Sequence, residues 1–192
     1  MNTRLALEYA VPALWVAWLL YWWAASRNVK VTRRKESVAS RLGHVVPLGL
    51  AVWLLAAPRL PGGLLGGRFL PATLSVYALG LAVLFTGLAF TVWARIWLGR
   101  NWSGTVTLKE GHELICSGPY RFVRHPIYTG LLVAFAGSAI ARSEWRGLVA
   151  LAIAFVALWR KLKLEERWLG ETFGEAYARY RAEVPALIPF LL

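Results

Sequence analysis

The stretch Ser117-Gly-Pro-Tyr-Arg-Phe-Val-Arg-His-Pro-Ile-Tyr-Thr-Gly130 lies between two long apolar runs of the chain. Its prolines and glycines predict a turn followed by the start of a helix, because glycine permits the turn and proline fits the first helical position. These roles leave Arg124, His125 and Tyr128 unexplained. We therefore treat the stretch as a candidate functional segment around which the remaining chain is arranged.

The composition is typical of an integral membrane protein. Hydrophobic residues make up 58% of the sequence and charged residues only 17%, compared with roughly 25% charged residues in an average soluble domain. The 192 residues contain no repeat, low-complexity tract or flexible linker, so we expect one domain over residues 1–192. The N-terminus lacks a signal-peptide pattern, and the first apolar run is expected to remain as a membrane helix.

Apolar runs long enough to cross a bilayer recur along the chain. They predict an all-α integral membrane protein with about five transmembrane helices, of which the last two form an antiparallel hairpin. From Arg160 onward, apolar and charged residues alternate at helical spacing, which predicts an amphipathic tail helix on the cytoplasmic face. The expected spans are residues 9–25, 44–57, 71–98, 126–141 and 147–159.

Lysine and arginine are distributed unevenly between the two sides of this layout. The loops after the first and third spans and the tail hold seventeen of them, and the opposite side holds five. This bias predicts an outside N-terminus and places the polar stretch and the tail together on the cytoplasmic side. It also explains the net charge of +12 without nucleic acid, since no basic helix or aromatic strand of a known binding module is present. The richness in alanine, leucine and arginine favours a multi-pass protein of a prokaryotic inner membrane.

Histidine and cysteine are too scarce for a metal site or a disulfide. The three histidines, His44, His112 and His125, do not form pairs on one helix face, so we expect no metal ion. The single Cys116 excludes an intrachain disulfide. Because it has no evident activating neighbour, we interpret it as a small packing residue rather than a nucleophile.

Two adjacent carboxylates, Glu165 and Glu166, follow the last apolar run. Neighbouring helix positions point about 100° apart, so one carboxylate can face inward while the other faces solvent. An inward Glu would meet the Arg124-His125 corner, since buried opposite charges need one another. The alternative is a pair of solvated ion pairs with nearby basic residues. Similarly, His125 either helps to bind an anion at the helix N-terminus or only caps that helix.

Together these motifs resemble the isoprenylcysteine carboxyl methyltransferase family, within a wider group that includes phospholipid methyltransferases. The resemblance covers the C-terminal part of the chain, about residues 99–192, which is therefore the expected catalytic part. The first 90 or so residues match only as apolar spans. The matching residues are Gly118-Pro119-Tyr120, Arg124-His125-Pro126, Tyr128 and Gly130, followed by Glu165-Glu166, Leu169, Phe173-Gly174, Tyr177, Tyr180 and Val184-Pro185.

The resemblance implies S-adenosyl-L-methionine as the cofactor and S-adenosyl-L-homocysteine as the product, bound at the cytoplasmic face without a Rossmann domain. It implies a lipophilic acceptor, first of all the carboxyl group of a prenylcysteine-type substrate. The cofactor contacts that it implies are His112, Leu114, Tyr120, His125, Tyr128 and one of Glu165 or Glu166, which we assign to Glu165.

The acceptor determines which residues are catalytic. A carboxylate is already a nucleophile and needs only a cation to hold it, for which Arg124 and Arg167 are the candidates and Arg179 is a weaker one. An amine, as in N-methylation of a phospholipid headgroup, needs a base, for which Glu166 is the candidate. Two further alternatives are a nicotinamide-dependent membrane reductase and a non-enzymatic membrane protein. The non-enzymatic protein would not need the paired motifs.

Overall fold

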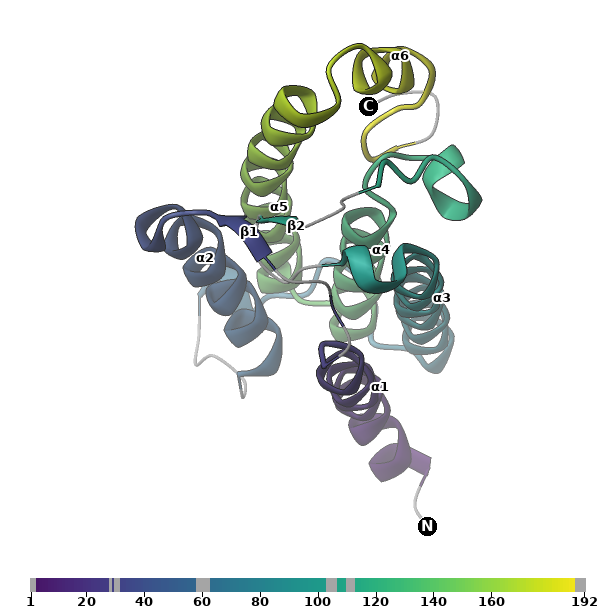
Figure 1. Ribbon diagram of the computed structural model, residues 1–192. Helices are drawn as coiled ribbons and strands as arrows, with labels where there is room; N and C mark the ends of the chain where they lie inside the picture. Colours follow the sequence, from purple (N-terminus) through teal and green to yellow (C-terminus); the bar gives the residue numbers. More distant parts are fainter. Residues whose placement is uncertain are drawn as a thin grey trace.

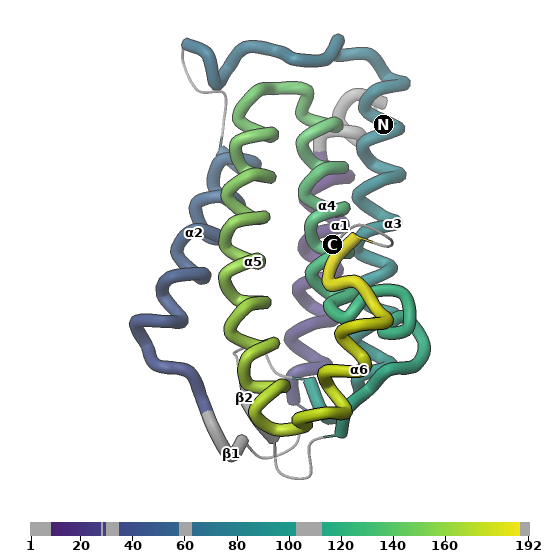
Figure 2. Tube along the Cα trace, turned by 90° about the horizontal axis from the view of Figure 1, so that it is seen from above, coloured from purple at the N-terminus to yellow at the C-terminus, as the bar shows by residue number. Residues whose placement is uncertain are grey.

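The computed structural model describes residues 3–27, 29, 32–57, 63–102, 107–109 and 113–188. Helices dominate this part of the chain, as predicted, and several of them run side by side (Figures 1 and 2). The long helices are α1 (Thr3–Ala25), α2 (Val38–Ala56), α3 (Leu74–Leu98), α4 (Pro126–Arg142) and α5 (Trp145–Phe173), followed by the short α6 (Glu175–Glu183). Short 3₁₀ turns are η1 (Leu64–Gly66), η2 (Gly99–Asn101) and η3 (Gly118–Arg121).

One short β-ribbon departs from the all-α prediction. Strands β1 (Thr32–Lys35) and β2 (Thr107–Lys109) pair antiparallel, with Lys35 opposite Thr107. The sequence prediction missed it because such short polar strands have no apolar periodicity.

Helix starts follow the local sequence. The Ser37 hydroxyl accepts a hydrogen bond from the amide of Ser40 at the start of α2, and Thr73 accepts one from Val76 at the start of α3, so each cap satisfies an amide that the helix leaves free. Proline 126 is the first residue of α4, as predicted. These caps fix where the long helices begin.

Two helices of the described chain are long and apolar enough to cross a membrane, at residues 38–56 and 74–101. Two shorter apolar helical segments, Tyr9–Ala25 and Pro126–Arg142, accompany them. Helix α5 differs from the expectation of a span that ends at Trp159 before a separate tail helix. It continues without a break to Phe173, so the predicted amphipathic tail is the second half of α5 together with α6.

The closest helix packing joins α3 to α4 through glycines. A Cβ atom on Gly87 would lie 2.5 Å from the backbone nitrogen of Ala134, and one on Gly137 would lie 2.2 Å from that of Leu84. Both distances are far shorter than a van der Waals contact, so only glycine allows the two backbones to approach this closely. This contact fixes the position of α4, and with it the candidate segment at the N-terminal end of α4.

The chain after α6 folds back onto that segment. The backbone amides of Arg124 and His125 donate hydrogen bonds to the carbonyls of Pro185 at 2.8 Å and Ala186 at 3.0 Å. The Thr129 hydroxyl donates to the Leu187 carbonyl at 2.7 Å. The start of α4 is therefore held from both sides, by the rest of the bundle and by the C-terminal residues.

Candidate functional site

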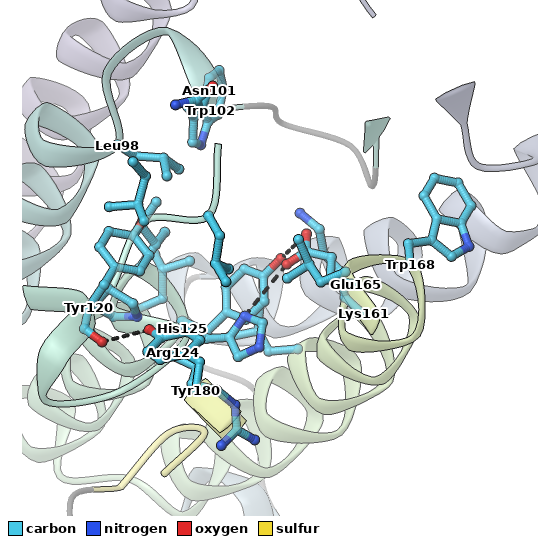
Figure 3. Close-up of a pocket in the computed structure, with 18 of the residues that line it drawn as sticks. Leu98, Asn101, Trp102, Tyr120, Arg124, His125, Lys161, Glu165, Trp168 and Tyr180 are labelled. Carbon is cyan, nitrogen blue, oxygen red and sulfur yellow. Dashed lines mark hydrogen bonds and ion pairs between the residues drawn. The ribbon is translucent and has the colours of Figure 1, made fainter. Parts of the chain in front are cut away.

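A cavity of about 240 Å³ lies where the start of α4, the second half of α5 and α6 meet (Figure 3). Its volume lies slightly below the range for small-molecule sites, roughly 300–1,000 Å³. The predicted site residues Leu114, Tyr120, Arg124, His125, Tyr128 and Glu165 line it. Other residues around it are Trp18, Trp22, Leu48, Leu98, Asn101, Trp102, Glu113, Ile115, Pro126, Ile127, Leu131, Leu158, Lys161, Trp168, Leu169, Tyr177 and Tyr180.

His125 lies between the two adjacent carboxylates. Its Nδ1 is 3.6 Å from Glu165 Oε2, and its Nε2 is 3.5 Å from Glu166 Oε1. The side chain is buried, and Nε2 makes no hydrogen bond of good geometry within the described structure. Burial lowers the pKa of His125, but the interactions with Glu165 and Glu166 outweigh it, and the net effect raises this pKa above its usual value. His125 is thus a histidine that two carboxylates favour in the protonated form.

Glu166 does not line the cavity, because its carboxylate is bound to Arg124. Arg124 donates to Glu166 Oε1 from Nε at 2.8 Å and from Nη2 at 2.5 Å. The same guanidinium donates to the carbonyls of Arg181, at 3.1 Å, and Val184. Burial raises the pKa of Glu166, but the bonds to His125 and Arg124 outweigh this effect and lower it to about 2. A carboxylate with so low a pKa is a poor base, which argues against the base role suggested for Glu166.

Glu165 is the carboxylate that faces the cavity, which answers a question the sequence left open. Its Oε1 accepts a hydrogen bond of 2.5 Å from the Tyr128 hydroxyl. The Tyr128 ring is stacked on the His125 ring, with centroids 5.4 Å apart and an interplanar angle of 2°. Burial raises the pKa of Glu165, but His125 and Lys161 outweigh this effect, and the net pKa is lowered. Glu165 is therefore a fixed anion on the cavity wall.

Aromatic side chains from the first part of the chain form another wall of the cavity. Trp18 and Trp22 of α1 line it with Trp102, whose ring centroid is 5.7 Å from that of Trp22 at an angle of 87°. The Arg95 guanidinium lies 4.7 Å from the Trp102 ring centroid. Sequence reasoning missed this wall, since tryptophans in an apolar helix equally fit an interfacial belt.

Helix α6 contributes two buried tyrosines with different roles. The Tyr180 hydroxyl donates to the Tyr120 carbonyl at 2.6 Å and so attaches α6 to η3 (Figure 3). The Tyr177 hydroxyl is buried beside Arg124 and Glu166, and it makes no hydrogen bond of good geometry in the described structure. Burial, together with the charge of Glu166, raises the pKa of Tyr177. Tyr177 is therefore a neutral tyrosine of the cavity wall beside the Arg124–Glu166 pair.

Besides Glu166, the predicted residues Arg167 and Arg179 do not line the cavity. Arg167 is exposed and lines a separate depression with Ser40 and other residues of α2 and α5. Arg179 is exposed on α6. His112 lies outside the described residues. Of the proposed cations for an acceptor carboxylate, the structure brings only Arg124 to the cavity, and it adds Lys161, which sequence reasoning did not select.

Comparison with known proteins supports the motif-based interpretation. The chain is 30% identical over 118 residues to protein-S-isoprenylcysteine O-methyltransferase B of Arabidopsis thaliana, covering 58% of each chain. It is 30% identical over 104 residues to the corresponding enzyme of Schizosaccharomyces pombe, covering 51% of this chain and 43% of the relative. It is 38% identical over 71 residues to methanethiol S-methyltransferase 1 of Bradyrhizobium diazoefficiens, covering 37% of this chain and 24% of the relative.

The chain thus spans 58% or less of the length of these curated relatives. They confirm the resemblance to isoprenylcysteine methyltransferases that the two motifs predicted. The phospholipid methyltransferase family model matches residues 75–176, more than half of the chain. This range contains all residues of the cavity wall except Trp18, Trp22, Leu48, Tyr177 and Tyr180. The chain therefore belongs to the phospholipid methyltransferase family.

Proposed function

We propose that this protein is a membrane methyltransferase that uses S-adenosyl-L-methionine and methylates a lipophilic acceptor, first of all the carboxyl group of a prenylcysteine-type molecule. The observation that carries the proposal is the cavity in which Glu165, His125 and Tyr128 form one connected polar wall opposite an aromatic one. The family and the named relatives support methyl transfer as the reaction class.

The donor groups of the cavity fit this cofactor. S-adenosyl-L-methionine carries an amino group, a carboxylate, ribose hydroxyls, an adenine ring and a cationic sulfonium, and it supplies an electrophilic methyl group. The Glu165 carboxylate suits the amino group or the hydroxyls, and His125 at the N-terminus of α4 suits the carboxylate. The faces of Tyr120 and Trp102 suit the adenine and the sulfonium.

The charge state of the cavity favours an acceptor that is already anionic. An amine must lose a proton before it can accept a methyl group, and that step needs a base with a pKa near neutrality. Glu165 and Glu166 both have lowered pKa values and are already engaged by neighbouring groups, and the same two carboxylates favour His125 in its protonated form, which cannot accept a proton. The residues therefore act chiefly by orienting the reactants and excluding water. Lys161 and Arg124 are the cations of the cavity wall, and each suits an acceptor carboxylate.

We further infer about five membrane crossings, by α1, α2, α3, α4 and the first half of α5, with an outside N-terminus and the cavity on the cytoplasmic side. Cys116 offers a direct test, because it is the single cysteine, it is exposed and it adjoins η3. A membrane-impermeant thiol reagent is expected to label it in inverted membrane vesicles but not in intact cells. Labelling from outside in intact cells would reverse the proposed orientation.

Calorimetric titration of the detergent-purified protein with S-adenosyl-L-homocysteine tests the cofactor proposal. We expect micromolar binding that Glu165→Gln and His125→Ala each weaken by tenfold or more, about 1.4 kcal/mol or more. Glu175→Gln is the matched control, since Glu175 is an exposed carboxylate outside the cavity. A folded protein that binds no S-adenosyl-L-homocysteine would refute the proposal, and binding of NADPH instead would indicate a reductase.

A further inference from the structure

A second depression, which we call the basic groove, lies between α2 and α5 on the outer side of the cavity wall. Its volume is about 340 Å³, and its lining is mostly cationic. Lys161 lines both this groove and the cavity, so the two spaces are neighbours. The groove is lined by Ser40 and His44 of α2 and by Arg160, Lys161, Lys163, Leu164 and Arg167 of α5.

Three of the groove cations have no carboxylate partner within the described structure. Arg160, Lys163 and Arg167 form no ion pair there. Arg160 instead donates to the Ser40 carbonyl at 2.8 Å, and the Lys163 ammonium lies 4.6 Å from the Trp159 ring centroid. Such a concentration of like charge is unfavourable unless an anion neutralises it.

The contact between α2 and Arg160 depends on a glycine. A Cβ atom on Gly43 would lie 2.3 Å from Nη1 of Arg160 and 2.6 Å from its Cζ. The absence of a side chain at Gly43 thus lets the guanidinium lie against α2. Beside it, the His44 side chain is 2% exposed and lies 3.4 Å from Glu36, and neither of its ring nitrogens makes a hydrogen bond of good geometry in the described structure.

The groove lies at the boundary between apolar and polar helix surface. Val156, Arg160, Lys163 and Arg167 are spaced along one face of α5 at intervals of three or four residues. Val156 is 65% exposed, and the three basic residues after it are exposed as well. A ligand on this face therefore meets an apolar surface at one end and a cluster of cations at the other.

We propose that the basic groove binds the phosphate of an anionic membrane phospholipid, with the acyl chains lying toward Val156. The planar guanidinium of arginine can donate two parallel hydrogen bonds to phosphate oxygens. Basic residues next to an apolar surface also attract anionic lipid. A free anion would not use the apolar part of this face, which is why we assign the site to a lipid. The proposal concerns a surface outside the cavity and does not depend on methyl transfer.

Native mass spectrometry of the delipidated protein in detergent measures this binding directly. The probes are phosphatidylglycerol, phosphatidylcholine with matched acyl chains, and inorganic phosphate. We expect wild type to bind phosphatidylglycerol at least tenfold more tightly than the Arg160→Gln, Arg167→Gln double variant does. Phosphatidylcholine and inorganic phosphate are expected to bind wild type at least tenfold more weakly than phosphatidylglycerol.

The matched control is the Arg100→Gln, Arg121→Gln double variant, which removes the same charge from exposed positions outside the groove. It is expected to bind phosphatidylglycerol like wild type. Equal losses in the groove and control variants would overturn the proposal, since binding would then follow net charge alone. Inorganic phosphate binding as tightly as phosphatidylglycerol would overturn the assignment to a lipid.

Lys163→Gln is a second variant that tests the basic groove. If the double variant does not fold, Lys163→Gln replaces it, because the Lys163 ammonium contacts only the Trp159 ring among the contacts described. We expect this single change to weaken phosphatidylglycerol binding at least threefold while S-adenosyl-L-homocysteine binding stays unchanged. Unchanged phosphatidylglycerol binding in this variant would contradict the proposal.

Discussion

Arg124 and Glu166 are joined by two hydrogen bonds to one carboxylate oxygen, 2.8 Å from Nε and 2.5 Å from Nη2 of the guanidinium. Their side chains are only 8% and 5% exposed. The same guanidinium binds carbonyls at the end of α6. One arginine therefore connects the start of α4, the second half of α5 and the C-terminal residues behind the cavity.

Removing one partner of this pair is expected to destabilise the protein strongly. Arg124→Gln leaves the Glu166 carboxylate buried without its cation, and we expect a loss of about 3 kcal/mol in the free energy of unfolding. Denaturant unfolding in mixed micelles measures it, with the exposed Arg121→Gln as control, for which about 0.5 kcal/mol or less is expected. A double-mutant cycle with Glu166→Gln should give a coupling of at least about 1 kcal/mol, and additive losses would contradict a direct pair.

The low pKa of Glu166 predicts a loss of stability in acid. Its folded-state pKa of about 2 lies below the ordinary value of 4.5, so the unfolded state binds more protons between these values. The contribution of Glu166 is complete above about pH 4.5 and is lost as the pH falls toward 2. Glu166→Gln should flatten this part of the stability profile, measured as melting temperature against pH. An unchanged acid slope in that variant would contradict the ion pair.

The raised pKa of His125 predicts the opposite trend in alkaline solution. Because the folded protein holds this proton more tightly than the unfolded chain, the stabilisation is complete below the ordinary pKa of 6.5. It is lost as the pH rises from 6.5 through the raised folded-state value. His125→Gln should remove this decline in melting temperature, whereas the solvent-exposed change Glu175→Gln should keep it. A decline that persists in His125→Gln would assign it to another group.

The glycine contacts between α3 and α4 predict a strong effect of a single methyl group. Gly137→Ala and Gly87→Ala each place a Cβ atom against backbone of the neighbouring helix, and we expect each to destabilise by about 1–3 kcal/mol. Gly49→Ala in α2 is the matched control, since a Cβ atom there would meet nothing within 4 Å. That change should be neutral or stabilise by up to about 1 kcal/mol. Denaturant unfolding compares the three, and equal effects would contradict the close packing.

The hydrogen bond from Tyr180 predicts how firmly α6 is attached. Tyr180→Phe removes the donor to the Tyr120 carbonyl, which lies 2.6 Å away, and should cost about 1 kcal/mol. Protection of the α6 amides from hydrogen exchange should fall in this variant and stay unchanged in Tyr9→Phe, where the side chain is 68% exposed. Equal protection of α6 in wild type and Tyr180→Phe would show that other contacts attach it.

The sequence itself predicted the elements that depend on local chemistry. The apolar runs gave the long helices, and Pro126 gave the start of α4. The family resemblance grouped Tyr120, His125, Tyr128 and Glu165, all of which line the cavity, and their contact with the cofactor stays a prediction. The helix predictions are confirmed because helical periodicity and the restricted backbone of proline are properties of short segments.

Only the tertiary structure decided how distant groups share the site. Three consecutive residues of α5 have different surroundings: Glu165 lines the cavity, Glu166 binds Arg124, and Arg167 lines the basic groove. The tryptophan wall from α1 lies at the cavity because α1 packs in this bundle. Adjacent residues on a helix point about 100° apart. Their partners therefore depend on how the whole helix is rotated about its axis and packed. The spacing of residues along the sequence does not specify that rotation.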